Sequence, residues 1–184
     1  QRLRLLHLRA GLPRLGHRAG MTQLTTARLI LRRFREADFP AAQEYLGDPE
    51  VMRWIEPPFP PEKTKAFLEK YALTSDPLVY ALVEKESSRL AGHVIFHAYP
   101  GLPGCWELGW VLGRAFWGRG YAFEVSHALL AAVQDCHRIS RVILEAHPEN
   151  RASLRLIRRL GAVPEGEGDG LLRFSILCKK PLSD

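Results

Sequence analysis

Length, composition and charge indicate a single globular domain and exclude several other classes of protein. The chain has 184 residues, of which 46% are hydrophobic and 25% are charged, and these values are typical of one domain. Its net charge is +6, but residues 1–20 contribute five arginines and no acid. Since residues 21–184 carry 21 basic and 20 acidic side chains, we expect no basic nucleic-acid-binding face and no nucleic-acid partner.

Residues 1–20 differ from the rest of the chain. They lack the continuous apolar core of a secretory signal, so we expect a disordered basic leader or an upstream extension there, followed by one domain over residues 21–184. An arginine-rich, acid-free segment also suits a transit peptide or a nucleic-acid-binding arm, and these alternatives stay open.

The cysteine pattern and the apolar runs favour a cytoplasmic protein. Cys105, Cys136 and Cys178 are odd in number, widely spaced and in no CxxC pair, so we expect neither a disulfide framework nor a metal site. No apolar run approaches the roughly 18 residues that span a bilayer, and we therefore expect no membrane partner.

In chain order, the first half of the domain predicts one strand followed by helices. The alternation of apolar and polar side chains over residues 27–34 is typical of a strand. Residues 36–55 then predict a helix that ends at Gly47 and a short second helix, with Asp48 as N-cap and Pro49 at its first position. A proline-rich loop leads from there into a third predicted helix.

The second half predicts a sheet with a single parallel crossover. The expected strands are residues 77–85, 90–100, 105–112, 140–148, 161–166 and 171–180, and the expected helices are residues 121–136 and 150–161. Asn150 is the expected N-cap of the last helix, and Gly161 its C-terminal stop. This order predicts an α/β (α+β) domain with a mixed, mostly antiparallel sheet of about 6–7 strands flanked by helices, with one βαβ unit around a glycine-rich loop.

The stretch VLGRAFWGRGYAFEV sets a glycine-rich turn between a strand and a helix, where backbone N–H groups and the helix dipole favour an anion. The nucleotide P-loop requires Lys and then Ser or Thr where Arg119 and Gly120 stand here. The dinucleotide fingerprint G-x-G-x-x-G fits Gly118 and Gly120, but Phe123 replaces its third glycine. A third pattern, [RQ]-x-x-G-x-[GA], fits with Trp117 at its first position, although an ordinary glycine-rich turn explains the same residues.

Two flanking segments distinguish the third pattern from an ordinary turn. WELGWVL precedes FWGRGYAFE, and HPENRASLRLIRRLGA follows it one strand later. Over about residues 28–180 the chain resembles the GNAT acetyltransferase superfamily, most of all the branch that acetylates the N-termini of ribosomal proteins and its relatives that modify small amines. The resemblance implies the GNAT fold, acetyl-CoA as cosubstrate, no metal, and a monomer or homodimer.

The resemblance implies that acetyl-CoA lies along the glycine loop and the strand before it. In the superfamily, loop amides hold the pyrophosphate, and the splayed strand binds the pantetheine arm and polarises the thioester. The implied acetyl-CoA-binding residues are Trp110, Val111, Leu112, Trp117, Gly118, Arg119, Gly120, Tyr121, Ala122, Asn150 and Ser153. Because Trp117 replaces the Arg or Gln of the pattern, one side-chain donor is lost, and Arg114 and Arg119 are candidates to replace it.

Acetyl transfer needs a neutral amine and a hydrogen-bond donor for the departing thiolate. The resemblance implies Glu107 as the base or amine-orienting group, with His93 or His97 as alternative bases. Many superfamily members use a tyrosine of the last helix as the thiolate donor, but Ile157 occupies that position here. The serine found in the ribosomal-protein branch corresponds to Ser153, so the expected catalytic residues are Glu107 and Ser153.

The resemblance places the acceptor groove between the early helices and the late hairpin. Trp54, Glu56 and Phe59 are the expected substrate-binding residues, since acids attract a cationic amine and aromatic rings hold its stem. Further candidates are the hairpin acids Glu165, Glu167 and Asp169. The expected activity is acetyl transfer to a primary amine, above all a protein N-terminal α-amino group. The alternatives are a small-molecule amine such as an antibiotic or polyamine, and a non-catalytic acyl-CoA-binding sensor.

Overall fold

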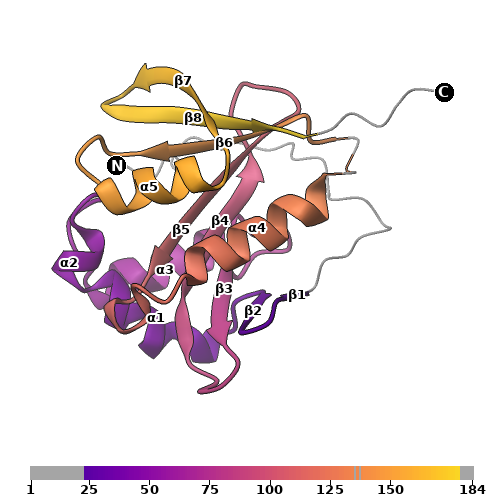
Figure 1. Cartoon of the computed structure of the whole chain (residues 1–184). Coiled ribbons are helices and arrows are strands. Elements are labelled where there is room, and N and C mark those ends of the chain that lie inside the picture. The colour runs from indigo at the N-terminus through magenta and orange to yellow at the C-terminus, as the bar shows by residue number, and fades with distance from the viewer. Residues whose placement is uncertain (1–22, 135, 137, 179–184) are drawn as a thin grey trace.

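The computed structural model describes residues 23–134, 136 and 138–178, and it shows one eight-stranded sheet with helices on both faces (Figure 1). The strands are β1 (Gln23–Thr25), β2 (Leu29–Arg32), β3 (Val79–Glu84), β4 (Leu90–Ala98), β5 (Cys105–Leu112), β6 (Arg141–Ala146), β7 (Val163–Gly168) and β8 (Leu171–Leu177). They lie in the order β1-β2-β3-β4-β5-β6-β8-β7. Only the β5–β6 pair is parallel among the strand pairs of the described residues.

The helices lie on the sheet in two groups. They are α1 (Phe39–Leu46), α2 (Pro49–Met52), α3 (Pro61–Tyr71), α4 (Tyr121–Val133) and α5 (Arg151–Arg159). The first three pack on one face and the last two on the other (Figure 1). Two predicted caps are confirmed, because the side chain of Asp48 accepts a hydrogen bond from the Glu50 amide and that of Asn150 accepts one from the Ser153 amide.

Most of the predicted architecture is confirmed, including the mixed sheet and the single βαβ unit, β5-α4-β6. The sequence pattern does not predict β1, which pairs Gln23 with Arg32. Three residues are too few to show an alternation. The predicted leader lies outside the described residues. Among those that are described, no helix is long and apolar enough to span a membrane, and no group of three or more His, Cys, Asp or Glu side chains could hold a metal.

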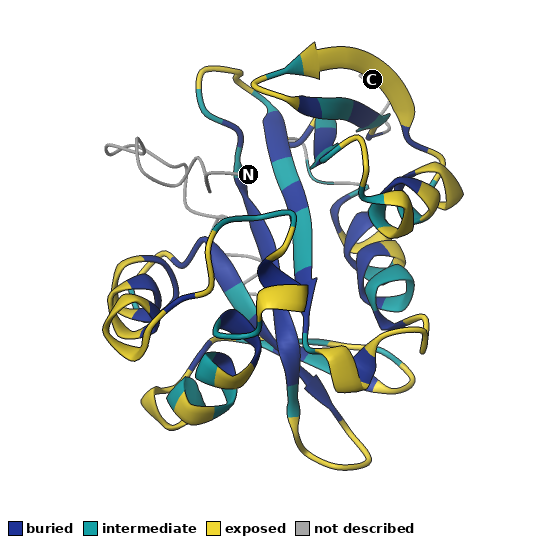
Figure 2. Ribbon diagram, turned by 90° about the vertical axis from the view of Figure 1, so that its left-hand side faces the viewer, coloured by how far each residue is buried: buried dark blue, intermediate teal, exposed yellow. Residues whose placement is uncertain are grey.

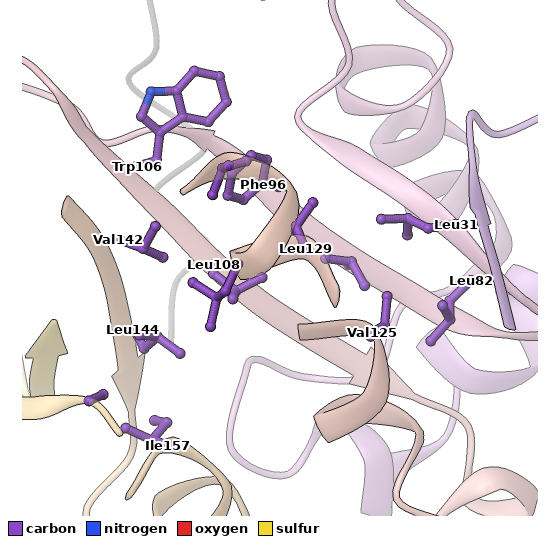
Figure 3. Close-up of a cluster of buried hydrophobic side chains, with 14 of the residues drawn as sticks. Leu31, Leu82, Phe96, Trp106, Leu108, Val125, Leu129, Val142, Leu144 and Ile157 are labelled. Carbon is purple, nitrogen blue, oxygen red and sulfur yellow. The ribbon is translucent and has the colours of Figure 1, made fainter. Parts of the chain in front are cut away.

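Alternation along the central strands builds a separate hydrophobic core on each face of the sheet. On the α4–α5 face, Leu108 of β5 packs in one cluster with Val125 and Leu129 of α4 and Ile157 of α5 (Figure 3). On the other face, Val111 of β5 joins the cluster formed by α1 and α3. The central strands are therefore buried on both faces, whereas β7 is an exposed edge (Figure 2).

Candidate active site

The glycine loop joins β5 to α4 and has the conformation that its sequence requires. Gly118 and Gly120 have φ values of +71° and +77°, a left-handed backbone that favours glycine. A Cβ atom built on Gly118 would meet no other atom within 4 Å, so the loop is open on that side. Helix α4 begins directly after Gly120, and its first amide groups therefore face the loop. This arrangement can hold an anion through backbone N–H groups.

A buried carboxylate at the end of β3 fixes the loop from beneath. Glu84 is 5% exposed and accepts hydrogen bonds from the hydroxyls of Ser87 and Tyr121, and from Nη1 of Arg119 at 2.9 Å. The hydrogen bonds from Ser87 and Tyr121 lower the pKa of Glu84, so its side chain is ionised at neutral pH. Glu84 closes an apolar strand and belongs to no motif, so the sequence gives no signal of this role.

Arg114 and Arg119, the two candidate replacements for the missing donor, are both ion-paired within the chain. Nε of Arg114 lies 2.7 Å from a carboxylate oxygen of Asp48, the N-cap of α2. Arg119 pairs with Glu84. The ring of Trp117 is 48% exposed, and its Nε1 donates to the Leu112 carbonyl at 2.7 Å. Trp117 therefore fastens the loop to the end of β5.

A pocket of about 570 Å³ lies beside the loop, and we call it the α4–α5 pocket. Its lining includes Arg28, Arg119, Phe123, Glu124, His127 and Arg159. The β1–β2 turn forms one wall, because Glu124 accepts hydrogen bonds from the Thr26 hydroxyl at 2.6 Å and from the Arg28 amide at 2.9 Å. The pocket thus joins the loop to both α4 and α5.

The parallel strands β5 and β6 are paired along only part of their length. Their ladder runs from Cys105 opposite Arg141 to Glu107 opposite Ile143. Beyond that point β5 continues to Leu112 and β6 to Ala146 without a further rung in the ladder. On this side of β5 the backbone groups of Trp110 are thus available to a ligand that enters between the strands, whereas the Val111 carbonyl faces Gly92 of β4, so the expected backbone contact of Val111 with acetyl-CoA is not available here.

The N-terminus of α5 follows the C-terminal end of β6, at the end of the sheet where β5 and β6 separate. Oδ1 of Asn150 is engaged in the helix cap, at 3.1 Å from the Ser153 amide, which leaves the side-chain NH₂ for other partners. Ser153 is half-buried, and its hydroxyl makes no hydrogen bond to another described residue. Ile157, in contrast, is fully buried in the α4–α5 core and carries no polar group.

The sequence profile of the acetyltransferase (GNAT) domain matches residues 28–163, which is most of the chain. The chain belongs to the GNAT acetyltransferase family. It is similar to the uncharacterized N-acetyltransferase YnaD of Bacillus subtilis (strain 168), with 33% identity over 144 residues that cover 78% of this chain and 84% of YnaD.

Solved structures support the fold of this GNAT acetyltransferase. A GNAT-family acetyltransferase from Bacillus anthracis has a TM-score of 0.76 at 28% identity, over 84% of this chain and 98% of that one. A spermidine N-acetyltransferase from Vibrio cholerae, solved with CoA and spermine, has a TM-score of 0.70 at 18% identity, over 84% and 98%. At that identity the second likeness shows the fold alone.

In the acetyltransferase, Glu107 lies at the last rung of the β5–β6 ladder, on the face that α1 and α3 cover further along the sheet. Its Oε2 is 3.5 Å from Nε2 of His97, which β4 places directly opposite. Nδ1 of His97 is 2.8 Å from the Ala98 carbonyl and must donate to it, because a carbonyl only accepts. Burial lowers the pKa of His97, so the neutral ring presents the lone pair of Nε2 to Glu107.

His93, the other alternative base, is enclosed in the core. Its ring is 0% exposed, Nδ1 is 2.8 Å from the Tyr45 hydroxyl, and the ring of Phe67 lies 5.6 Å away. Burial lowers the pKa of His93 to about 3. We therefore set His93 aside as a base, since no amine can reach a fully enclosed ring.

The structure separates the three predicted acceptor-binding residues. Trp54, after α2, stacks on His147, at the end of β6, with ring centroids 4.7 Å apart, so it closes the gap between these elements. The side chain of Glu56 pairs with Lys63 at 2.5 Å. Phe59 is only 3% exposed and packs against Phe67, which corrects its assignment to the groove wall. A proline-rich loop predicts an exposed position, but here it turns this ring into the core.

No sequence motif predicts the contact of His147 with Trp54. Nδ1 of His147 accepts a hydrogen bond from the Glu149 amide at 3.2 Å, and this bond holds the ring against Trp54. One of the hairpin acids, Glu165, already has partners within the chain. It forms an ion pair with Arg141 at 2.8 Å and accepts a hydrogen bond from the Ser175 hydroxyl at 2.6 Å. Asp169 forms the turn before β8 with a φ of +53°.

Proposed function

We propose that the protein transfers the acetyl group of acetyl-CoA to a primary amine, and that this amine is the N-terminal α-amino group of a protein or peptide. The observation that carries the proposal is the Glu107–His97 pair, which stands where β5 and β6 separate. A proton acceptor at this point lies beside the gap between β5 and β6, where a thioester bound along β5 would be placed.

The residues along the gap fit acetyl-CoA. The open glycine loop offers amides to the pyrophosphate, and the unpaired side of β5 offers the backbone groups of Trp110 to the pantetheine arm. Bound acetyl-CoA supplies an activated acyl carbon and a thiolate leaving group. A β5 amide directed at the thioester oxygen stabilises the negative charge that develops there.

Glu107 and His97 together take the proton that the amine loses. The amine nitrogen forms the new C–N bond as the C–S bond breaks, and a proton passes from nitrogen to the Glu107 carboxylate. The lone pair of His97 Nε2 then accepts a hydrogen bond from the protonated carboxyl group. Ser153 donates a hydrogen bond to the departing thiolate, which solvent later protonates.

The lower pKa of an α-amino group favours it over a lysine side chain as the acceptor. An α-amino group has a pKa of about 8, so about a tenth of it is neutral at pH 7, whereas a lysine side chain at about 10.4 is almost wholly charged. Because the α-amino group loses its proton more easily, it is the better acceptor for a carboxylate base such as Glu107.

Charge pairing at the groove argues against a polyamine. Several ammonium groups require several carboxylates, and two of the candidate groove acids, Glu56 and Glu165, already pair with Lys63 and Arg141, which leaves fewer for a polyamine. A single amine needs only the Glu107 site. Acetylation of a small-molecule monoamine and a binding-only role remain outcomes of the test below.

The test is the release of CoA thiol from acetyl-CoA with peptides that begin with Ala or Ser, with spermidine and with an aminoglycoside. Glu107→Gln and Ser153→Ala accompany the parent, with Glu44→Gln and Ser75→Ala as exposed controls. Peptide-dependent release that Glu107→Gln and Ser153→Ala reduce supports the proposal. Release with spermidine alone would overturn the acceptor class, and binding of acetyl-CoA without release by any amine would indicate a sensor.

A further inference from the structure

The α4–α5 pocket contains three arginines from three different elements. Arg28 belongs to the β1–β2 segment, Arg119 to the glycine loop and Arg159 to the last turn of α5. Their roles depend on how much of each charge is already balanced inside the protein, because a cation with a carboxylate partner attracts an anion less strongly.

Two of these arginines are neutralised. Arg28 pairs with Glu124 at 2.6 Å, and Arg119 pairs with Glu84 at 2.9 Å. Within the part of the chain that the structure describes, Arg159 has no carboxylate within ion-pair distance. Among the pocket's arginines, the uncompensated positive charge is thus that of Arg159.

Arg159 is also held in place. Its guanidinium carbon lies 4.0 Å from the centroid of the Phe123 ring, and Phe123 stacks on His127 with ring centroids 5.7 Å apart. A guanidinium that lies on an aromatic face is oriented by the ring and keeps its N–H groups free at its edge. The side chain is therefore positioned for a ligand before the ligand arrives.

We infer that Arg159 recognises the 3′-phosphate of the coenzyme and so makes the protein select acetyl-CoA over acetyl-3′-dephospho-CoA. This inference rests on the proposed use of acetyl-CoA. The pyrophosphate is served by the backbone amides of the glycine loop, whereas a phosphate monoester carries a charge between −1 and −2 at neutral pH and needs a cation of its own. Arg159 lines the same pocket as Arg119 and Gly120 of the glycine loop, so a coenzyme whose pyrophosphate lies on the loop can direct its 3′-phosphate to Arg159.

Isothermal titration of the whole chain with both ligands tests the inference. For the parent, we expect acetyl-CoA to bind about five- to tenfold more tightly than acetyl-3′-dephospho-CoA, as suits one partly exposed charge-assisted contact. Arg159→Gln should lose this preference by weakening acetyl-CoA alone. Arg158→Gln is the matched control, because this exposed neighbour on α5 does not line the pocket.

Each other outcome overturns the inference in a distinct way. Equal binding of the two ligands by the parent, or an equal loss for both ligands in Arg159→Gln, would show that Arg159 does not read the 3′-phosphate. The same selective loss in Arg158→Gln would assign the effect to the general positive charge of α5. If the parent bound neither ligand, the proposed use of acetyl-CoA would fail, and this inference with it.

Discussion

Nε2 of His97 lies 3.5 Å from Oε2 of Glu107 across the β4–β5 ladder, and the bond from His97 Nδ1 to the Ala98 carbonyl directs the lone pair of Nε2 toward that carboxylate. The two side chains therefore form one site for one proton. The lone pair of His97 Nε2 and the Glu107 carboxylate repel each other until a proton lies between them, so each group makes the other a better proton acceptor.

Replacing His97 with Phe should reduce kcat by about tenfold. It should also shift the pH at which kcat falls on the acidic side of its pH profile, here called the acidic limb. The pKa of His97 is lowered by burial, so the parent ring becomes charged, and kcat falls, only below the ordinary value of about 6.5. In His97→Phe the limb depends on Glu107 alone and should move to lower pH. The measurement is kcat at saturating substrates from pH 5 to 9, and an unchanged limb would show that His97 takes no part.

His93 should make the fold sensitive to acid. Its pKa is about 3 in the folded protein and about 6.5 in the unfolded chain, so below pH 6.5 the unfolded chain binds a proton that the folded one does not. The free energy of unfolding therefore falls as pH falls, by about 2 kcal/mol from this group between pH 6.5 and 5. Urea unfolding at both pH values should show a smaller drop for His93→Gln, but the parental drop for the exposed control His127→Gln.

Removing the carboxylate at the end of β3 should loosen the glycine loop. Glu84→Ala leaves the buried Tyr121 hydroxyl without its acceptor, and we expect the free energy of unfolding to fall by about 2 kcal/mol. Glu86→Ala, on the exposed turn after β3, should change it by less than about 0.5 kcal/mol. Equal unfolding midpoints in urea for the two variants would contradict the role of Glu84.

Variants of Ser153 and Asn150 should have different effects, because Ser153 is expected to act in catalysis and Asn150 in capping α5. Ser153→Ala keeps the backbone amide that donates a hydrogen bond to Asn150 Oδ1. The free energy of unfolding should therefore stay the same, while kcat falls by about tenfold. Asn150→Ala removes the cap and should lower the free energy of unfolding by about 1 kcal/mol. Thermal melts and kcat for both variants, with Ser153→Thr as the hydroxyl-retaining control, check this. A parental kcat for Ser153→Ala would exclude the thiolate donor.

Local rules predict the elements and their order. The period of apolar residues marks β5 and α4, and Asp48 and Asn150 mark the starts of α2 and α5, because these signals depend on neighbours in sequence. The motif also places the loop and the strand beside it correctly, since the ladder of β5 with β6 stops at Glu107.

Long-range contacts were not accessible from the same rules. Glu84 reaches Arg119 and Tyr121 across 35 and 37 positions, so no local pattern marks it. Phe59 follows two prolines, which indicate an exposed loop, yet tertiary packing buries its ring on Phe67. Charge pairing is equally remote, and it distinguishes Arg159 from the two other arginines of its pocket.

The most direct test of the central claim is a single-turnover measurement with Glu107→Gln. Enzyme loaded with acetyl-CoA is mixed with an Ala- or Ser-initiated peptide, and acetyl-peptide formation is followed at pH 7. We expect the rate constant to fall by about 100-fold relative to the parent, while the Kd of acetyl-CoA stays the same. A parental rate constant for Glu107→Gln would contradict the assignment of the Glu107–His97 pair as the base.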